Sequence, residues 1–220
     1  KRNTGSPFKQ WKKGLDLAQG DFIWIAESDD SCDLNFLETQ LKHLKEADVV
    51  VAKTIDLIHC HQKNEILHPI FDVTKQDEDI LYCPILNVSA VLFKSQLLNA
   101  VKSNYHNDFK LIGDRVFYFD YFRNALIASN NETCNYFRQS NSNLSKLNSR
   151  KLGYYMDYFD EHCRFIQYAK SRDSKITNRL AERYINKFYR RISNRVSKEQ
   201  KRSLNYFWLF LKYRYKLLCH

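Results

Sequence analysis

Short apolar runs alternate with helix-length amphipathic segments through the first 150 residues, and this alternation limits the fold more than any other feature. The run Phe22–Ala26 has the length of a buried strand and follows directly on a helical pattern. Apolar side chains in that pattern recur at steps of three and four residues, at Phe8, Trp11, Leu15 and Ala18. Helices and strands of these lengths in alternation predict an α/β fold, a sheet flanked by helices.

The later elements are expected from the same patterns, with one weak stretch. Between Ile55 and Ile85 the periodicity is poor, and we expect short strands and a mobile loop around the acidic run Asp77–Asp79. The clearer patterns predict helices over Asp33–Glu46 and from Gly113 onward, and strands over Val49–Lys53, Asn87–Phe93 and Leu126–Ala128.

The last 70 residues differ from the rest in charge and pattern, which predicts a domain boundary. Residues 1–150 hold 18 Lys and Arg against 19 Asp and Glu, whereas residues 151–220 hold 17 against 6. We therefore expect one domain over residues 1–150 and a helical basic appendage over 151–220. A second helix is expected over Leu204–Leu218, where aromatic and basic residues mix. Apolar residues of the first tail helix recur every four positions, at Ile176, Leu180, Tyr184, Phe188, Ile192 and Val196.

Composition excludes several other classes of protein. The chain is 44% hydrophobic and 27% charged, ordinary values for a globular protein, and no apolar run approaches the ~20 residues that a membrane span needs. Its six cysteines form no Cys-x-x-Cys pair, so we expect reduced thiols and a cytoplasmic location. The chain begins at Lys1 without a signal-peptide pattern, and we expect it to be a piece of a longer protein.

Acidic residues directly follow the predicted strand Phe22–Ala26, in the run Glu27-Ser28-Asp29-Asp30. In open α/β sheets ligands bind at the carboxyl ends of strands, and carboxylates placed there can hold a hard divalent cation together with substrate phosphates. The same aspartates could instead cap the next helix. The charge pattern alone leaves both interpretations open.

Four motifs in sequence resemble family 2 glycosyltransferases of the GT-A fold. The segment over residues 14–38 resembles the family's central block, a helix ending in Gly, a strand, and an Asp-x-Asp-type motif. Three later segments match in the family's order. They are Asn87–Phe93, the pair Gly113-Asp114, and Asn135-Tyr136-Phe137-Arg138. The resemblance covers residues 3–145 and implies an incomplete GT-A-type mixed sheet flanked by helices, followed by the α-helical basic tail.

The resemblance also implies a role for each matching residue. Asp29 would be the principal ligand of Mn²⁺ or Mg²⁺, and Asp30 would support the metal or the donor sugar. Glu27 would contact the ribose, or the metal through water. Asp114 would be the general base that takes the proton of the acceptor hydroxyl, and Arg138 would contact the diphosphate. The donor would be a nucleotide-sugar, a UDP-linked one by this resemblance.

Two features depart from the family pattern. The family's His that follows the Arg by two positions is Ser140 here. The family's first strand, its Thr- or Asn-rich turn and its second strand ending in Asp-Asp have no counterpart upstream of Asn3. We therefore expect the chain as given to lack a complete nucleotide site and part of its parallel sheet.

Structural interpretations compete with some of these chemical ones. Asp114 could simply cap its helix, where its negative charge would interact favourably with the positive N-terminal end of the helix dipole. Arg138 could be an ion-pair partner with a structural role. We expect Trp11 and Trp24 to belong to the core rather than to form sugar platforms. A metal site at His59-Cys60-His61 is disfavoured because neighbouring strand residues point to opposite faces.

The basic tail over 175–218 has three interpretations. It could be a solvated helical face, it could bind the anionic inner face of the cell membrane, or it could bind nucleic acid. We rank the membrane surface first and nucleic acid last, because the first 150 residues carry no recognisable nucleic-acid module.

The resemblance predicts an enzyme that moves a sugar from a nucleotide-sugar donor to a bacterial surface glycan, such as capsule, O-antigen or exopolysaccharide. The displacement would be metal-assisted and inverting, and a glycan or lipid-linked acceptor would explain a peripheral position at the membrane. The alternative is a non-catalytic, truncated transferase whose helices bind membrane, nucleic acid or protein.

Overall fold

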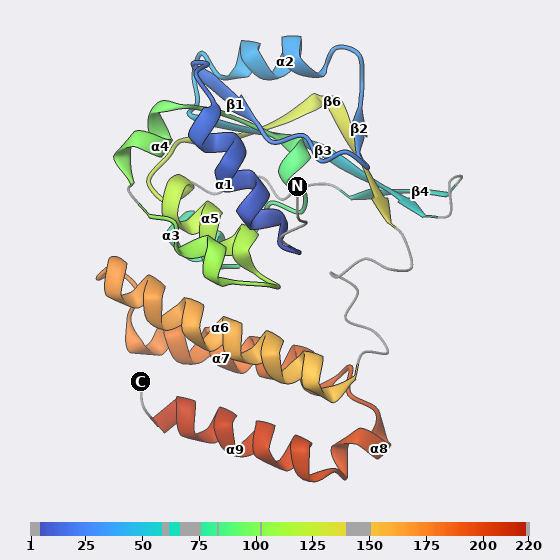
Figure 1. Cartoon of the computed structure of the whole chain (residues 1–220), viewed down its shortest axis with the longest axis vertical. Coiled ribbons are helices and arrows are strands. Elements are labelled where there is room, and N and C mark those ends of the chain that lie inside the picture. The colour runs from blue at the N-terminus through green and yellow to red at the C-terminus, as the bar shows by residue number, and fades with distance from the viewer. Residues whose placement is uncertain are drawn as a thin grey trace. The chain divides into compact units, whose positions relative to one another are not determined.

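The computed structural model of the chain describes residues 5–58, 62–66, 76–82, 84–101, 103–139 and 151–218. The chain divides into two compact units, Lys1–Asn143 and Leu144–His220 (Figure 1). The segment His59-Cys60-His61, considered above as a metal site, and Ser140, which stands where the family has His, lie outside the described residues.

A mixed sheet forms the centre of the first unit, as the sequence predicts. Among the described residues its strand order is β1-β5-β3-β6-β2, and β4 pairs with β3. Strands β3 and β6 run parallel, and the other pairs are antiparallel. The strands are β1 (Phe22–Trp24), β2 (Ser31–Cys32), β3 (Val49–Ile58), β4 (Gln62–Ile66), β5 (Val91–Lys94) and β6 (Ile127–Gln139).

Helices cover both faces of this sheet (Figure 1). Trp24 packs against Phe36 of α2 on one face, with a ring separation of 5.0 Å. On the other face Phe93 packs against Phe117 and Phe122 of α5. Helix α5 is buried nearly all round, including its charged residues Arg115 and Asp120. The helices of this unit are α1 (Pro7–Leu17), α2 (Phe36–His43), α3 (Gln76–Leu81), α4 (Gln96–Ala100) and α5 (Gly113–Phe122), with 3₁₀ turns at Val88–Ala90 and Tyr105–Asp108.

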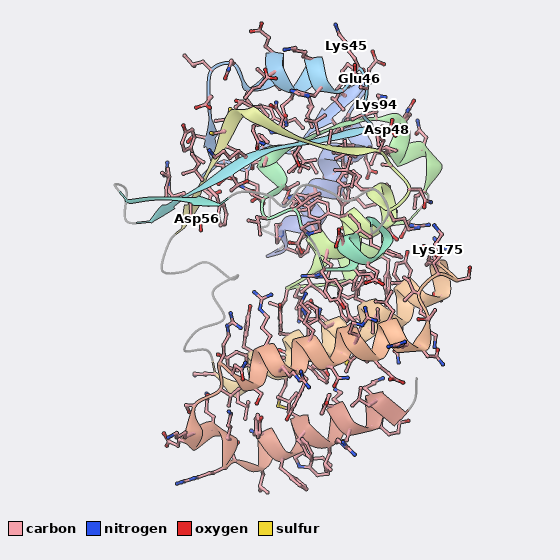
Figure 2. All side chains as sticks on the ribbon, turned by 180° about the vertical axis from the view of Figure 1, so that it is seen from behind. Lys45, Glu46, Asp48, Asp56, Lys94 and Lys175 are labelled. Carbon is pink, nitrogen blue, oxygen red and sulfur yellow. The ribbon has the colours of Figure 1, made fainter. Side chains whose placement is uncertain are left out.

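One carboxylate ties together the start of β3, the end of β5 and the start of β6. Asp48 precedes β3 and accepts hydrogen bonds from the Lys94 Nζ atom at 3.1 Å and from the Leu126 backbone N–H at 3.1 Å. Figure 2 shows Asp48 beside Lys94. The backbone N–H of Lys94 also donates to the Asp48 carbonyl at 3.0 Å. This single side chain therefore helps to set the register of β3, β5 and β6.

Three sequence predictions for this unit are corrected by the structure. The strand expected over Asn87–Phe93 begins only at Val91, because the Asn87 side chain accepts a hydrogen bond from the Ser89 N–H and bends the chain into a 3₁₀ turn. The loop expected around Asp77–Asp79 lies within α3. The short strand at Leu126–Ala128 is the start of the long strand β6, which follows β3 through a register shift.

The helix expected over Asp33–Glu46 is shorter than predicted, since α2 begins at Phe36. Asp33 belongs instead to the edge between β2 and β6. Its carboxylate accepts hydrogen bonds from the Cys134 N–H at 2.8 Å and from the Tyr136 hydroxyl at 2.9 Å. Long-range partners thus outweigh the local helical pattern at this residue.

The second unit is helical, as expected, and contains a helix that the sequence analysis does not predict. This is α6 (Leu152–Arg172), which packs against α7 (Asn178–Ser193). Thr177 caps the N-terminus of α7, because its side chain accepts a hydrogen bond from the Leu180 N–H at 3.2 Å. The short α8 (Lys198–Lys201) and then α9 (Leu204–Leu218) complete the unit.

The apolar residues that recur every four positions along α7, its apolar stripe, lie inside this unit. Every member of the stripe is at most 7% exposed. Phe188 stacks on His162 of α6 at a ring separation of 3.6 Å, and the Tyr184 hydroxyl lies 2.6 Å from the His162 Nδ1 atom. The four-residue periodicity of α7 therefore reports packing between helices and not contact with a membrane.

Candidate active site

The turn after β1 is held in place by a residue from a distant part of the chain. Ser89 accepts a hydrogen bond from the Trp24 indole at its carbonyl oxygen (2.8 Å) and from the Glu27 N–H at its Oγ atom (3.0 Å). The Asp30 N–H donates to the Glu27 carbonyl at 3.2 Å and closes the turn. The run Glu27–Asp30 therefore has one defined path at the carboxyl end of β1.

Both carboxylate oxygens of Asp30 accept hydrogen bonds from other strands or turns. The Asn87 amide donates to Oδ2 at 2.8 Å, and the backbone N–H of Arg138 donates to Oδ1 at 3.4 Å. The same Asn87 amide nitrogen lies 2.8 Å from the Asn135 Oδ1 atom. These contacts join the acidic turn to the 3₁₀ turn and to β6, and they keep Asp30 in a fixed orientation.

Asp29, in contrast, is exposed. Its side chain makes no hydrogen bond to any residue within the described ranges. The carboxylate oxygens of Asp29 therefore face solvent and can meet a ligand.

Glu27 lies in a setting that opposes its charge. Burial, followed by the negative charges of Asp30 and Asp29, raises its pKa from 4.5 to about 7. A hydrogen bond from Trp11 acts in the opposite direction, and the charge of Asp114 raises the pKa further. The carboxyl group of Glu27 is therefore partly protonated near neutral pH.

Asp114 belongs to the same electrostatic cluster, although it lies 84 or more positions further along the chain than the acidic turn. It stands in the first turn of α5, where one of its oxygens accepts a hydrogen bond from the Arg115 N–H at 2.8 Å. Its half-buried carboxylate is close enough to raise the pKa of Glu27. The structure thus gathers Glu27, Asp29, Asp30 and Asp114 at the carboxyl end of β1.

A close approach of α5 to α1 sets the position of Asp114. A Cβ atom at Gly113 would lie 2.6 Å from the Phe8 Cγ atom and 2.7 Å from the His106 carbonyl oxygen. Only glycine fits this contact without displacing its neighbours. The first turn of α5 can therefore lie directly against α1 and the turn at Tyr105–Asp108.

Arg138 reaches the site through its backbone, as described above, while its side chain is exposed. The structure therefore brings Arg138 next to Asp30.

The donor set suits a cation that takes most of its ligands from elsewhere. Within the described ranges no group of three or more His, Cys, Asp or Glu side chains is arranged to enclose a metal ion. Mg²⁺ is commonly held by one or two carboxylates together with water and substrate phosphates. Asp29, with Asp30 beside it, fits that pattern and does not fit a closed metal cage.

Sequence reasoning missed the residues that organise the site. Asn87 and Ser89 hold the acidic turn, and Trp11 bonds to Glu27. Asn87 and Ser89 are 4% and 1% exposed. Polar residues within an otherwise apolar run were the available signal, because a buried polar group needs a partner. Trp11 and Trp24 lie in or beside the core, as predicted.

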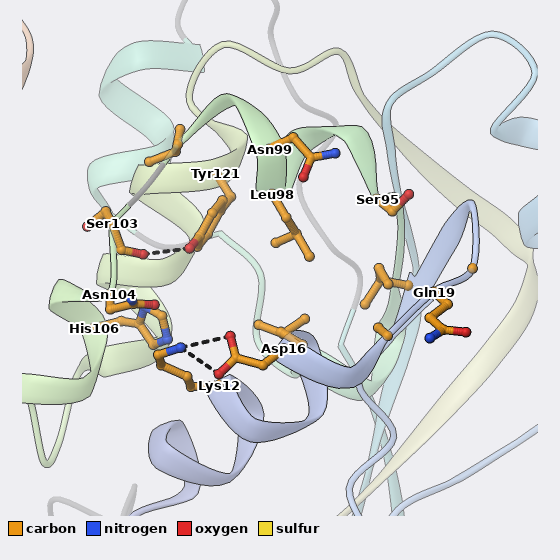
Figure 3. A pocket seen from close by; sticks show the side chains of 15 residues that line it. Lys12, Asp16, Gln19, Ser95, Leu98, Asn99, Ser103, Asn104, His106 and Tyr121 are labelled. Carbon is orange, nitrogen blue, oxygen red and sulfur yellow. Dashed lines mark hydrogen bonds and ion pairs between the residues drawn. The ribbon is translucent and has the colours of Figure 1, made fainter.

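A separate cavity of about 540 Å³ lies beside α1 (Figure 3). Lys12 and Asp16 form an ion pair in it at 2.6 Å, and the Tyr121 hydroxyl donates to the Ser103 carbonyl at 2.6 Å. His106 is buried there, and burial, followed by the charge of Lys12, lowers its pKa to about 4. None of the four carboxylates lines this cavity, so the carboxylate cluster is a different site.

Comparisons with known proteins agree with the fold. The model of glycosyl transferase family 2 matches residues 1–123. Residues 1–349 of S. aureus TarS, solved in complex with UDP-GlcNAc, superpose with a TM-score of 0.62 at 17% identity, over 91% of this chain and 59% of that one. The complex with UDP gives 0.61 at 18% identity, over 91% and 58%. A longer TarS structure gives 0.55 at 16%, over 86% and 42%.

The chain thus spans less than two thirds of the TarS chains that it resembles. No curated protein matches the sequence. The α/β fold and the helical C-terminal region agree with the predicted GT-A-type architecture. On its family match, which covers more than half of its residues, the chain belongs to glycosyl transferase family 2.

Proposed function

We propose that this chain carries the catalytic carboxylates of an inverting glycosyltransferase that takes its sugar from a UDP-linked donor. The observation that carries the proposal is the gathering of Glu27, Asp29, Asp30 and Asp114 at the carboxyl end of β1, where burial and like charges raise the pKa of Glu27 to about 7. Membership of family 2 supports it, as do structural neighbours solved with UDP-GlcNAc and UDP.

Asp114 would act as the general base. The acceptor hydroxyl oxygen attacks the anomeric carbon of the donor, the bond from that carbon to the diphosphate oxygen breaks, and the proton passes from the hydroxyl to the Asp114 carboxylate. Attack from the face opposite the leaving group inverts the configuration at the anomeric carbon. The hydrogen bond from the Arg115 N–H to one Asp114 oxygen orients the carboxylate.

The acidic turn would bind the donor. Asp29 and Asp30 would hold Mn²⁺ or Mg²⁺, which supplies positive charge to the departing diphosphate. Asn87 keeps Asp30 oriented for this task. Glu27, partly protonated at neutral pH, would donate a hydrogen bond to a ribose hydroxyl, and Arg138 would contact the diphosphate.

The acceptor would be a growing surface glycan of the capsule, O-antigen or exopolysaccharide type, carried on a lipid or on the glycan itself. An enzyme with such an acceptor would act at the inner face of the cell membrane. This part of the proposal follows from the family resemblance.

Thermal unfolding of the full chain with UDP and Mn²⁺ tests the donor site. A ligand that binds only the folded form at a hundredfold excess over its Kd adds ~2.7 kcal/mol to the free energy of unfolding. We expect a shift of the melting temperature that needs both UDP and Mn²⁺ and that disappears in Asp29→Ala. Asp16→Ala, an exposed acidic residue outside the cluster, is the matched control and should keep the shift.

Asp114→Asn separates binding from chemistry. It should keep the shift with UDP and Mn²⁺ but lose transfer or hydrolysis of UDP-GlcNAc. If the wild type shows no metal-dependent shift, the proposal fails in favour of the non-catalytic interaction module.

A further inference from the structure

Helix α9 presents an apolar stripe to solvent. Six of its large apolar side chains are exposed. Phe210 (40%) lies apart from the rest, whereas at 100° per residue the other five fall within an arc of about 100° on the helix. We call this set the α9 stripe. Its members, with their exposed fractions, are Leu204 (78%), Phe207 (53%), Trp208 (61%), Leu211 (38%) and Tyr215 (63%).

The opposite face of α9 is already used for packing inside the second unit. Leu209 is 1% exposed. The Tyr206 hydroxyl lies 2.8 Å from the Ser193 Oγ atom of α7, and the Tyr213 ring stacks on Tyr189 of α7 at 3.9 Å. These contacts fix the rotation of α9 about its axis. One face of the helix packs inside the unit, and the stripe is a separate face that is exposed.

The charged residues of α9 itself are all basic. From Gln200 to His220 the sequence has no Asp or Glu and five Lys or Arg residues. On the helix, Arg214 lies at one border of the stripe and Lys212 at the other, where Lys212 forms an ion pair with Asp160 of α6. Helix α7 adds five exposed cations, Arg179, Arg183, Lys187, Arg190 and Arg191, and Arg195 follows directly after the helix.

These charges decide between the candidate occupants of the stripe. A second copy of the chain docked stripe to stripe would bring cations against cations with no acidic residue on either α9, and like charges oppose such contact. A bilayer with anionic headgroups attracts the flanking cations and receives Phe, Trp and Tyr at its interface. Helix α9 has 15 residues, fewer than the ~20 that a membrane span needs, so it would lie in the interface. Within the described part of the chain no helix is long and apolar enough to cross a membrane.

We propose that the α9 stripe docks into the headgroup region of an anionic bilayer, with Trp208 near the centre of the contact. This inference narrows the membrane-binding region expected over 175–218 to one face of one helix. It depends on the second unit alone and holds whether or not the first unit transfers sugar.

Trp208 provides a direct test in the full chain. The other tryptophans, Trp11 and Trp24, lie in the first unit and are buried or half-buried, whereas Trp208 is 61% exposed. With vesicles of phosphatidylglycerol and phosphatidylcholine, we expect the fluorescence to shift to shorter wavelength. Lipids brominated on their acyl chains should quench it. Vesicles of phosphatidylcholine alone should bind much more weakly.

Two matched pairs of variants test the surface itself. Trp208→Glu should weaken binding to the anionic vesicles by ~10-fold or more, because it removes an apolar anchor and adds a repelled charge. Leu17→Glu on α1, an equally exposed apolar residue at 80%, should bind as the wild type does. Arg214→Glu and Asp16→Lys each change the net charge by two, in opposite directions. Arg214 borders the stripe and Asp16 does not, so Arg214→Glu should weaken binding to the anionic vesicles by a larger factor than Asp16→Lys strengthens it.

Three results would overturn the proposal. The first is equal binding by the wild type and Trp208→Glu. The second is equal loss in Trp208→Glu and Leu17→Glu. The third is absence of vesicle binding together with a dimer that Trp208→Glu dissociates, since the occupant would then be a second copy of the chain. Circular dichroism of each variant confirms that its helices are intact.

Discussion

Replacing Gly113 by alanine should destabilise the first unit and disturb the candidate base that follows it. The added Cβ atom would lie 2.6 Å from the Phe8 Cγ atom and 2.7 Å from the His106 carbonyl oxygen. The Phe8 ring is packed edge-on against Trp11 at 5.3 Å, and the carbonyl belongs to the backbone. Neither neighbour can move without displacing another element.

The size of the effect follows from the kind of clash. Adding a methyl group to a well-packed contact typically costs ~1–3 kcal/mol. Replacing glycine in a helix by alanine gains ~0.5–1 kcal/mol, so the net loss in the free energy of unfolding should be ~1–2 kcal/mol. Gly14 of α1 is the matched control, because a Cβ atom there meets nothing within 4 Å. Gly14→Ala should be stabilising by ~0.5–1 kcal/mol.

Urea unfolding followed by tryptophan fluorescence measures both variants. Trp11 lies between Phe8 and Phe117 and therefore reports on this contact. With a slope of ~2 kcal/mol per molar urea, the midpoint of Gly113→Ala should fall by ~0.5–1 M. The reasoning is refuted if Gly113→Ala unfolds at the same urea concentration as the wild type, or if both alanine variants shift in the same direction.

Three further predictions concern the carboxylates and their partners. The pKa of Glu27 is raised from 4.5 to about 7. Between these two pH values the folded chain binds more protons than the unfolded chain. The contribution of Glu27 to the free energy of unfolding therefore falls as the pH rises from 4.5 to about 7. Glu27→Gln should flatten that fall, which urea unfolding at about pH 5 and pH 8 would detect; an unchanged slope would contradict it. Asp48→Ala removes the acceptor shared by Lys94 and a backbone N–H and should cost ~1–3 kcal/mol. Asp16→Ala, which removes an exposed pair, should cost at most ~0.5 kcal/mol in the same chemical denaturation. Asn87→Ala leaves Asp30 without its amide donor and should weaken UDP–Mn²⁺ binding in calorimetry, whereas unaltered affinity would separate Asn87 from the donor site.

Local patterns were sufficient for the elements that follow a simple period. The steps of three and four residues predicted α1 and α7, and the apolar runs at Phe22–Ala26 and Val49–Lys53 predicted β1 and the first half of β3. Side chains on one face of an element recur with the period of that element, whatever it packs against.

Patterns failed where a distant partner decided the outcome. Asp33 was predicted to begin a helix but lies outside α2, because Cys134 and Tyr136 donate hydrogen bonds to its carboxylate. Helix α6 escaped prediction because its buried face includes Glu161 and His162 among the aromatic residues, so its apolar period is interrupted. A polar residue can occupy such a face when a neighbouring element supplies a partner, and the sequence of one helix does not contain that information.

The sequence by itself determined the elements with a clear apolar period, the change from a balanced to a basic chain, and the acidic run at the end of a strand. Only the tertiary structure decided that Asp114 shares an electrostatic cluster with that run, that Asn87 and Ser89 hold the turn, and that the pKa of Glu27 is raised. The tertiary structure also decided that the apolar stripe of α7 is buried, whereas the apolar stripe of α9 is exposed. Periodicity is a property of neighbouring residues, whereas desolvation and the hydrogen-bond partners of a buried group depend on which distant segments pack around it.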